Sequence, residues 1–179
     1  MKNFRLIRPL VFCSVAFLIL SFSLFPGCKV YRFQDVTVPD SIKTIKINFI
    51  ENHASYINPQ FSPALTDKLK QKITSQTKLS QTNDEAKADW VIGGEVTEYY
   101  TSTSGITSQN GKSTTSINRL NISIKITKNE ANKDPVDYTV SRQFDYPSNQ
   151  SLQTAEAVLL DEMIRGLSDD IFNRLFSEW

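Results

Sequence analysis

The chain has 179 residues, with 20 Lys and Arg against 19 Asp and Glu and a formal net charge of +1. This near balance gives no sign of a nucleic-acid-binding surface. One histidine and two cysteines are too few to build a His/Cys metal cluster. A chain of this length can bury most of its apolar surface, so it needs no disulfide or metal to fold.

The first 27 residues have the pattern of a bacterial lipoprotein signal peptide. Three basic residues precede an apolar run from residue 10 to residue 25, and Gly27 stands directly before Cys28. A basic start, an apolar run and a small residue at a cleavage point are typical of secretory signals. We therefore expect cleavage before Cys28 and a covalent lipid on its thiol, with no other cofactor.

The lipidation motif is irregular, because Phe25 stands where leucine is usual and Pro26 where a small residue is usual. One alternative is an uncleaved anchor, but the apolar run is shorter than the roughly 20 residues that span a bilayer comfortably. Another is an ordinary signal that leaves Cys28 as a free thiol. Its only possible disulfide partner, Cys13, lies inside the apolar run and would be removed.

Cleavage leaves a 28–41 tether, which is extended and lipidated, and a single α+β domain over 42–179. Removing the 1–27 signal takes away three basic residues and no acidic one, so the net charge becomes −2. Lys29 follows the cysteine, whereas an aspartate there retains enterobacterial lipoproteins in the inner membrane. We therefore expect a lipid-anchored protein of the outer membrane, with its domain facing the periplasm.

The first predicted strand and helix come from two different periodicities. Ile45, Ile47 and Phe49 alternate with polar residues, which predicts a half-buried strand. A helix is predicted from Pro63 to Gln76, because apolar residues recur every four positions and Ser62 could cap its start. The stretch 77–88 is predicted to be a polar link.

Three further strands and a long helix complete the predicted fold. The strands cover 88–100, 119–127 and 136–144, and the helix runs from Leu152 almost to the end of the chain. Gly93-Gly94 in the second strand suggests a bulge or the close approach of another backbone. The predicted class is α+β: a two-layer sandwich with a four-stranded mixed/antiparallel sheet, in the order β-α-β-β-β-α. Both helices should cover one face, and the other face should be polar.

The sequence contains no recognisable catalytic motif. Gly105 to Ser113 resembles a phosphate-binding loop, but it has one residue too many and joins two strands instead of a strand and a helix. No nucleophile-elbow pattern surrounds any serine, and a Ser–His–acid triad would have to use His53, the single histidine. We therefore predict that the protein is not an enzyme.

The stretch 101–116 is unusual in composition, because ten of its sixteen residues are Ser or Thr. It reads as a long, solvated, flexible hairpin with Asn110 at its tip. Small hydroxyl side chains would also suit a projection into a hydrated cavity. Lys112 and Arg119 are then candidates to meet a phosphate or carboxylate, and Asn110 and Ser113 are candidate contacts beside them.

Together these features resemble the LPS-assembly lipoprotein family (LptE), as a divergent member. The resemblance rests on the Cys28 signal, the predicted strand at 44–53, the run from Asp89 to Glu98 and the long C-terminal helix. It implies an outer-membrane lipoprotein whose α+β domain plugs a large β-barrel (LptD-like) and assists its assembly. The barrel passes lipopolysaccharide to the cell surface, and some members are reported to bind this glycolipid. It implies no nucleic-acid partner.

Two other functions fit the same residues. One is a periplasmic lipoprotein that regulates a cell-envelope hydrolase, and the other is an accessory lipoprotein of a secretion pore. Isolation with one large barrel protein would favour the plug, whereas capture of a soluble hydrolase alone would exclude it.

Overall fold

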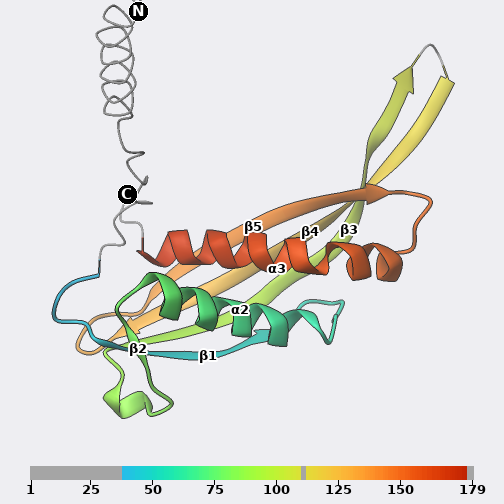
Figure 1. Ribbon diagram of the computed structural model, residues 1–179. Helices are drawn as coiled ribbons and strands as arrows, with labels where there is room; N and C mark the ends of the chain where they lie inside the picture. The colour runs from blue at the N-terminus through green and yellow to red at the C-terminus, as the bar shows by residue number, and fades with distance from the viewer. Residues whose placement is uncertain (1–37, 110–111, 177–179) are drawn as a thin grey trace, which may run out of the picture. The chain divides into compact units, whose positions relative to one another are not determined.

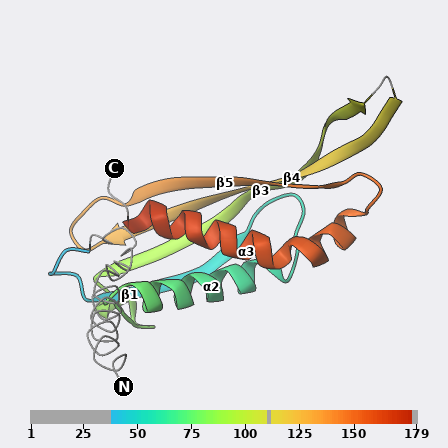
Figure 2. The same ribbon diagram turned by 45° about the horizontal axis from the view of Figure 1, so that its top comes forward.

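Five strands form one mixed sheet, and two helices lie side by side on one of its faces (Figures 1 and 2). The computed structural model describes residues 38–109 and 112–176, with the backbone alone for 104–109 and 112–116. The elements are β1 (Thr44–Asn52), α2 (Phe61–Gln76), β2 (Ser80–Gln81), a short 3-10 turn (Glu85–Lys87), β3 (Trp90–Gln109), β4 (Lys112–Glu130), β5 (Val136–Pro147) and α3 (Leu152–Phe176). The predicted α+β two-layer class is confirmed.

The strand order is β2-β1-β3-β4-β5. β1 runs parallel to β3 after the α2 crossover, and β3, β4 and β5 form an antiparallel meander. The predicted count of four strands is one too low. The additional strand, β2, is only two residues long and pairs with the start of β1. Two polar, exposed residues carry no alternation that a sequence pattern could reveal.

The core lies between the sheet and the two helices. The inward phase of β4, which is Leu120, Ile122, Ile124 and Ile126, is at most 1% exposed. The helices contribute the residues predicted from their apolar stripes, and these are also fully buried: Leu65, Leu69 and Ile73 from α2, and Met163, Leu167 and Ile171 from α3. Because the four longer strands direct most of their apolar side chains to one face, both helices must cover that face.

A bulge in β1 makes the predicted orientation of Phe49 wrong. Ile47 pairs with Ile92, but the next pair is Ile50 with Gly94, so two β1 residues lie opposite Gly93. An extra residue reverses the alternation of side chains along a strand. Ile50 therefore enters the core at 1% exposure, whereas Phe49 lies outside it at 52%.

Gly94 is the position of the predicted close approach. A Cβ added there would lie 2.7 Å from Cδ1 of Ile126 and 3.3 Å from the backbone oxygen of Lys125. A Cβ on Gly93 would meet nothing within 4 Å. The two neighbouring glycines therefore have different reasons to be present, and only Gly94 is required by packing.

The start of α2 also differs from the prediction. Ser62 is a buried residue inside the helix, and the first helical residue is Phe61. The backbone N–H of Gln60 donates to the side-chain oxygen of Asn58 at 3.0 Å, and that of Phe61 donates to the Asn58 carbonyl at 3.2 Å. An asparagine turn before the helix therefore fixes its start, so the predicted cap at Ser62 was wrong.

A buried carboxylate links the start of α3 to the sheet. Glu156 is 5% exposed, and it accepts hydrogen bonds from the hydroxyls of Tyr56 and Tyr99. Burial, followed by the hydrogen bond to Glu156, raises the pKa of Tyr99 far above its ordinary value. Both tyrosines therefore stay protonated as donors, and Glu156 is satisfied inside the core.

The β3–β4 hairpin is longer than predicted. Its ladder continues past Tyr100 to the pair Gln109–Lys112, whereas β1 ends opposite Val96 and β5 ends opposite Ile117. Beyond these points the two strands continue as a two-stranded arm, residues 104–109 and 112–116, with no other described strand beside it (Figure 1). The serine- and threonine-rich stretch is therefore paired backbone for most of its length.

The two glycines of β3 provide a matched test of the packing. We expect Gly94→Ala to lower the free energy of unfolding by about 1–3 kcal/mol, because the new methyl group overpacks the core against Ile126. Gly93→Ala should change it little, since space is open there. Urea unfolding of both variants measures this difference, and equal stability would contradict the close approach at Gly94.

Candidate interaction surface

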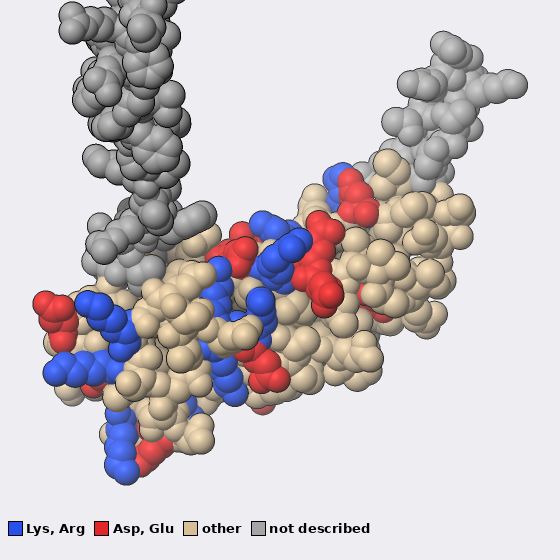
Figure 3. Space-filling model, in the orientation of Figure 1, with Lys and Arg blue, Asp and Glu red and all other residues tan. Residues whose placement is uncertain are grey.

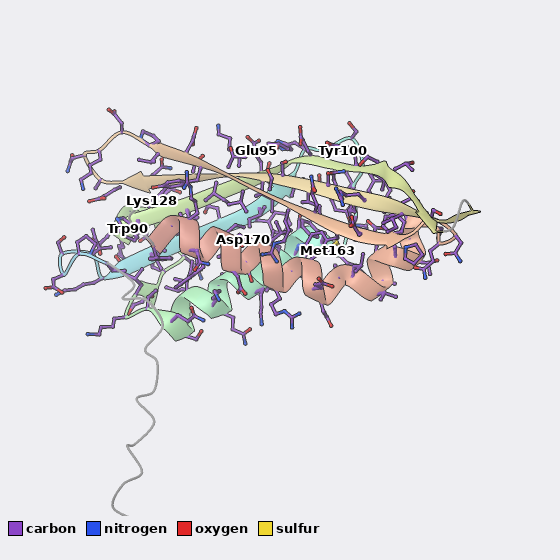
Figure 4. All side chains as sticks on the ribbon, turned by 90° about the horizontal axis from the view of Figure 1, so that it is seen from above. Trp90, Glu95, Tyr100, Lys128, Met163 and Asp170 are labelled. Carbon is purple, nitrogen blue, oxygen red and sulfur yellow. The ribbon has the colours of Figure 1, made fainter. Side chains whose placement is uncertain are left out.

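The face of the sheet opposite the helices is not covered by any described element. Side chains of alternate residues in each strand project from it, as Figure 4 shows for Glu95 and Tyr100, whereas Met163 and Asp170 lie on the helix side. This face, which we call the open face, is a sheet surface that the fold leaves without a partner among residues 38–109 and 112–176. It is therefore the first candidate for an interaction.

Cross-strand ion pairs join β4 to β5 on the open face. Nε of Arg119 donates to Oδ1 of Asp145 at 2.6 Å, and Nη2 donates to Oδ2 at 2.9 Å. Nζ of Lys125 lies 3.0 Å from Oδ2 of Asp137, which also accepts a hydrogen bond from Thr127. The Arg119 guanidinium lowers the pKa of Asp145, and the hydrogen bonds from Thr127 and Lys125 lower the pKa of Asp137. Both aspartates are therefore charged at neutral pH.

His53 bridges two carboxylates at the end of β1. Its Nδ1 lies 2.9 Å from Oε2 of Glu95, and its Nε2 lies 3.0 Å from Oε2 of Glu51. Both ring nitrogens can donate to these acceptors only when the imidazole carries both protons. The hydrogen bonds to Glu95 and then Glu51 accordingly raise the pKa of His53.

Hydroxyl and amide groups fill the space between the charges. Oγ of Ser123 donates to Glu98 at 2.9 Å and lies 2.9 Å from the Ser141 hydroxyl, and the Asn121 side chain donates to Ser102 at 3.0 Å. Two aromatic side chains, Phe49 and Tyr100, are each 52% exposed. The open face is thus polar and paired with itself, with two exposed rings.

Other kinds of site were sought in the described residues. Among the described residues, no group of three or more His, Cys, Asp or Glu is placed to hold a metal ion. No helix within 38–176 is both long and apolar enough to cross a membrane. On the helix-covered side, basic and acidic side chains are interleaved and form no field of one sign (Figure 3).

The structure places the predicted site residues apart from one another. Cys28 and Asn110 lie outside the described residues, and Lys112 and Ser113 begin β4 in the part described by backbone alone. Lys112 and Arg119 are seven residues apart on one strand, which separates them by about 23 Å. The structure therefore does not bring the two basic candidates together.

Arg119 is bonded to Asp145, which the sequence prediction missed. A signal was present, because Arg119 and Lys125 share the outward phase of one strand while Asp137 and Asp145 share that of the next. Opposite charges in phase on neighbouring antiparallel strands favour cross-strand pairs. Only the register decides which residues meet.

Solved structures resemble the chain at low identity. A homologue of a neuraminyllactose-binding hemagglutinin from Helicobacter pylori is 9% identical, with a TM-score of 0.53 over 82% of this chain and 87% of that chain. Rare lipoprotein B from Shewanella oneidensis is 12% identical, with a TM-score of 0.46 over 74% and 93%. A minor lipoprotein from Acinetobacter baumannii is 13% identical, with a TM-score of 0.43 over 76% and 94%. The Helicobacter similarity supports the fold alone.

Among curated protein sequences, none matches the chain. The family model described as "LptE: Lipopolysaccharide-assembly" matches residues 42–175, which is most of the chain and nearly all of the described domain. The expected family is thereby confirmed. The chain belongs to the LptE lipopolysaccharide-assembly family, a non-enzymatic family of lipoproteins associated with the outer membrane.

Proposed function

We propose that this protein is anchored in the outer membrane by a lipid on Cys28 and that its domain occupies the lumen of a large LptD-like β-barrel. In this position it plugs the barrel, supports its assembly and assists the passage of lipopolysaccharide to the cell surface. Membership of the LptE family supports the lipopolysaccharide-assembly part of this proposal. The position inside a barrel and the lipid anchor on Cys28 are proposals that go beyond family membership.

The observation that carries the proposal is the self-paired open face. The interior of an outer-membrane barrel is polar, so a plug must bury a polar surface against it. Burying an unpaired charge is expensive, whereas a charge already bonded to its partner loses much less on contact. On the open face, Arg119, Lys125 and His53 all bond to carboxylates of the same face. These three cations can therefore meet a polar wall while each keeps a carboxylate beside it.

The exposed rings of Phe49 and Tyr100 add apolar contact area within this polar face. Aromatic side chains surrounded by polar groups are typical of the energetically important positions of protein interfaces. The arm would extend the contact beyond the sheet, since six residues of strand span about 20 Å. Asn110, Lys112 and Ser113 at the arm's end are proposed contacts with the barrel or the glycolipid.

Tyr100 on the open face and Val158 on α3 provide a matched test, because both are exposed, at 52% and 76%. We expect Tyr100→Asp to reduce the amount of barrel protein isolated with the full-length chain about five-fold, since it places a charge in the contact. Val158→Asp should leave the yield unchanged. Quantitative mass spectrometry of the isolated complex measures both. Equal yields from the two variants would exclude the open face as the contact, and wild-type protein isolated without any barrel would exclude the plug.

Contact of the arm with lipopolysaccharide predicts an effect of charge reversal. Lys112→Glu together with Arg119→Glu should weaken lipopolysaccharide binding several-fold. Arg119→Glu alone should have the smaller effect, because Asp145 already binds that guanidinium. Lys133→Glu, at the turn between β4 and β5, makes the same charge change as Arg119→Glu and is the control for that single variant. Binding of purified lipopolysaccharide to the full-length chain in detergent is the measurement, and an unchanged affinity of the double variant would remove this site.

Lipidation of Cys28 predicts a specific mass for the membrane-purified protein. The mature chain should begin at Cys28 and carry acyl chains, and Cys28→Ala should block processing so that residues 1–27 remain attached. Cys13→Ala, which changes the other cysteine, should be processed normally. Intact-mass spectrometry compares the three proteins. Normal cleavage of the Cys28→Ala variant would instead indicate an ordinary secretory signal.

A further inference from the structure

The outer edge of the sheet is a long strand with one neighbour. β5 pairs only with β4, through a register that runs without a shift from Lys128–Val136 to Ile117–Pro147. In an antiparallel pair every second residue directs its N–H and C=O away from the partner strand. In the described part of the chain no strand accepts these groups, so they form an exposed row along β5.

Edge strands are usually protected by short length, a bulge, a proline or charged side chains that hinder pairing. The opposite edge is formed by the two-residue β2 and, beyond it, by β1, whose pairing is interrupted by the bulge between Ile47 and Ile50. β5 has twelve residues, no register shift, and a proline only at its end. Its charged residues bond to neighbours within the fold: Asp137 to Lys125, Asp145 to Arg119, and Arg142 to Asp170.

α3 runs beside β5 (Figures 1 and 2). Two hollows lie between these two elements. The first has a volume of about 270 Å³ and is lined by residues 143–145 of β5 together with Arg119 and, from α3, Leu159 and Glu162. The second has about 320 Å³ and is lined by residues 139–141 together with Asp170, Asn173 and Arg174 of α3. Three consecutive residues of a strand cannot share one face. Each hollow therefore opens at the edge of β5, beside the exposed backbone groups.

Arg142 separates the two hollows without covering the edge. Nε of Arg142 donates to Oδ2 of Asp170 at 2.8 Å, and Nη2 donates to Oδ1 at 3.1 Å. Its guanidinium lies where a Cβ of residue 166 would be, so Gly166 allows it to rest on α3. The long side chain is thereby held against the helix, which leaves the backbone of β5 accessible.

The hollows differ in charge. In the first, Asp145 is neutralised by Arg119, whereas the exposed Glu162 makes no ion pair or hydrogen bond within 38–109 and 112–176. In the second, Asp170 is bonded to Arg142 and the Arg174 guanidinium lies over the Tyr138 ring, while the side chain of Asn173 is exposed and has no hydrogen-bond partner among the same residues. The first hollow thus suits a cation, and the second suits an uncharged group that forms hydrogen bonds.

We propose that β5 and the two hollows form a strand-addition site for an extended segment of a partner protein. The segment carries a lysine or arginine and, four positions away, an uncharged polar residue. The hollows are centred on Val140 and Phe144, which are about 13 Å apart along the strand, and side chains at i and i+4 of an extended segment lie on the same side at that spacing. Main-chain hydrogen bonds supply affinity in such sites, and the hollows supply selectivity. The site shares Arg119 and Asp145 with the rim of the open face, but it does not depend on the barrel proposal.

A nine-residue probe peptide, Thr-Val-Lys-Thr-Thr-Thr-Asn-Val-Thr, tests the site on the full-length chain in detergent. We expect it to slow hydrogen exchange of β5 amides, as measured by NMR, and to lose binding when alternate backbone nitrogens are methylated. Glu162→Lys should weaken its binding about five-fold, because the carboxylate that meets the peptide lysine is reversed. Asp161→Lys makes the same charge change on the next, exposed residue and should leave binding within about two-fold, since Asp161 does not line the hollow.

Three results would overturn the proposal. Absence of binding at millimolar peptide would remove the site, and equal binding of the methylated peptide would exclude strand addition. Equal effects of Glu162→Lys and Asp161→Lys would show that the first hollow selects no cation. Self-association of the chain, seen by sedimentation and reversed by the peptide, would replace the partner segment by a second copy.

Discussion

One constraint underlies the whole domain: its four longer strands direct most of their apolar residues to the same face. Leu120, Ile122, Ile124 and Ile126 set this face in β4, and the sheet can bury it only under α2 and α3. With both helices committed to one side, the other side must be polar. The core, the open face and the β5 edge are therefore consequences of a single arrangement of side chains.

The polarity of the open face also follows from the positions of side chains along the strands. Charges on neighbouring strands are in phase, so Arg119 and Lys125 of β4 meet Asp145 and Asp137 of β5 across the ladder. A polar face made in this way is stable in water and remains suitable for contact with a polar wall. The β5 edge differs from the open face, since it offers unpaired backbone groups and hollows.

Much of this could be predicted from residue order, because the alternation in β4 and β5 and the stripes of the two helices are local patterns. The predictions were wrong where a tertiary contact determines the orientation of a residue or the start of a helix. The outward position of Phe49 depends on a bulge opposite Gly93, and the start of α2 depends on Asn58 instead of Ser62. Glu156 is buried only because two tyrosines from distant segments meet it.

The candidate sites show the same limit. Arg119 was recognised as a basic residue near the hairpin, but its bond to Asp145 depends on register, which no single strand reveals. β5 is an edge because it is the last strand in the order of the sheet, and the hollows form because α3 runs beside it. Such features have no signature in the sequence of β5 itself.

The arm has a consequence for how the domain opens. In its centre the β3–β4 ladder is flanked by other strands and covered by helices, whereas in the arm it is flanked by neither. An isolated pair of strands is at best marginally stable in water. The free energy needed to separate β3 from β4 therefore falls from the centre of the sheet toward Gln109 and Lys112, so the hairpin unzips from its tip while the core stays closed. The β3–β4 hairpin is thus rigid where it crosses the sheet, whereas the pairing of its arm depends on the surroundings of the arm.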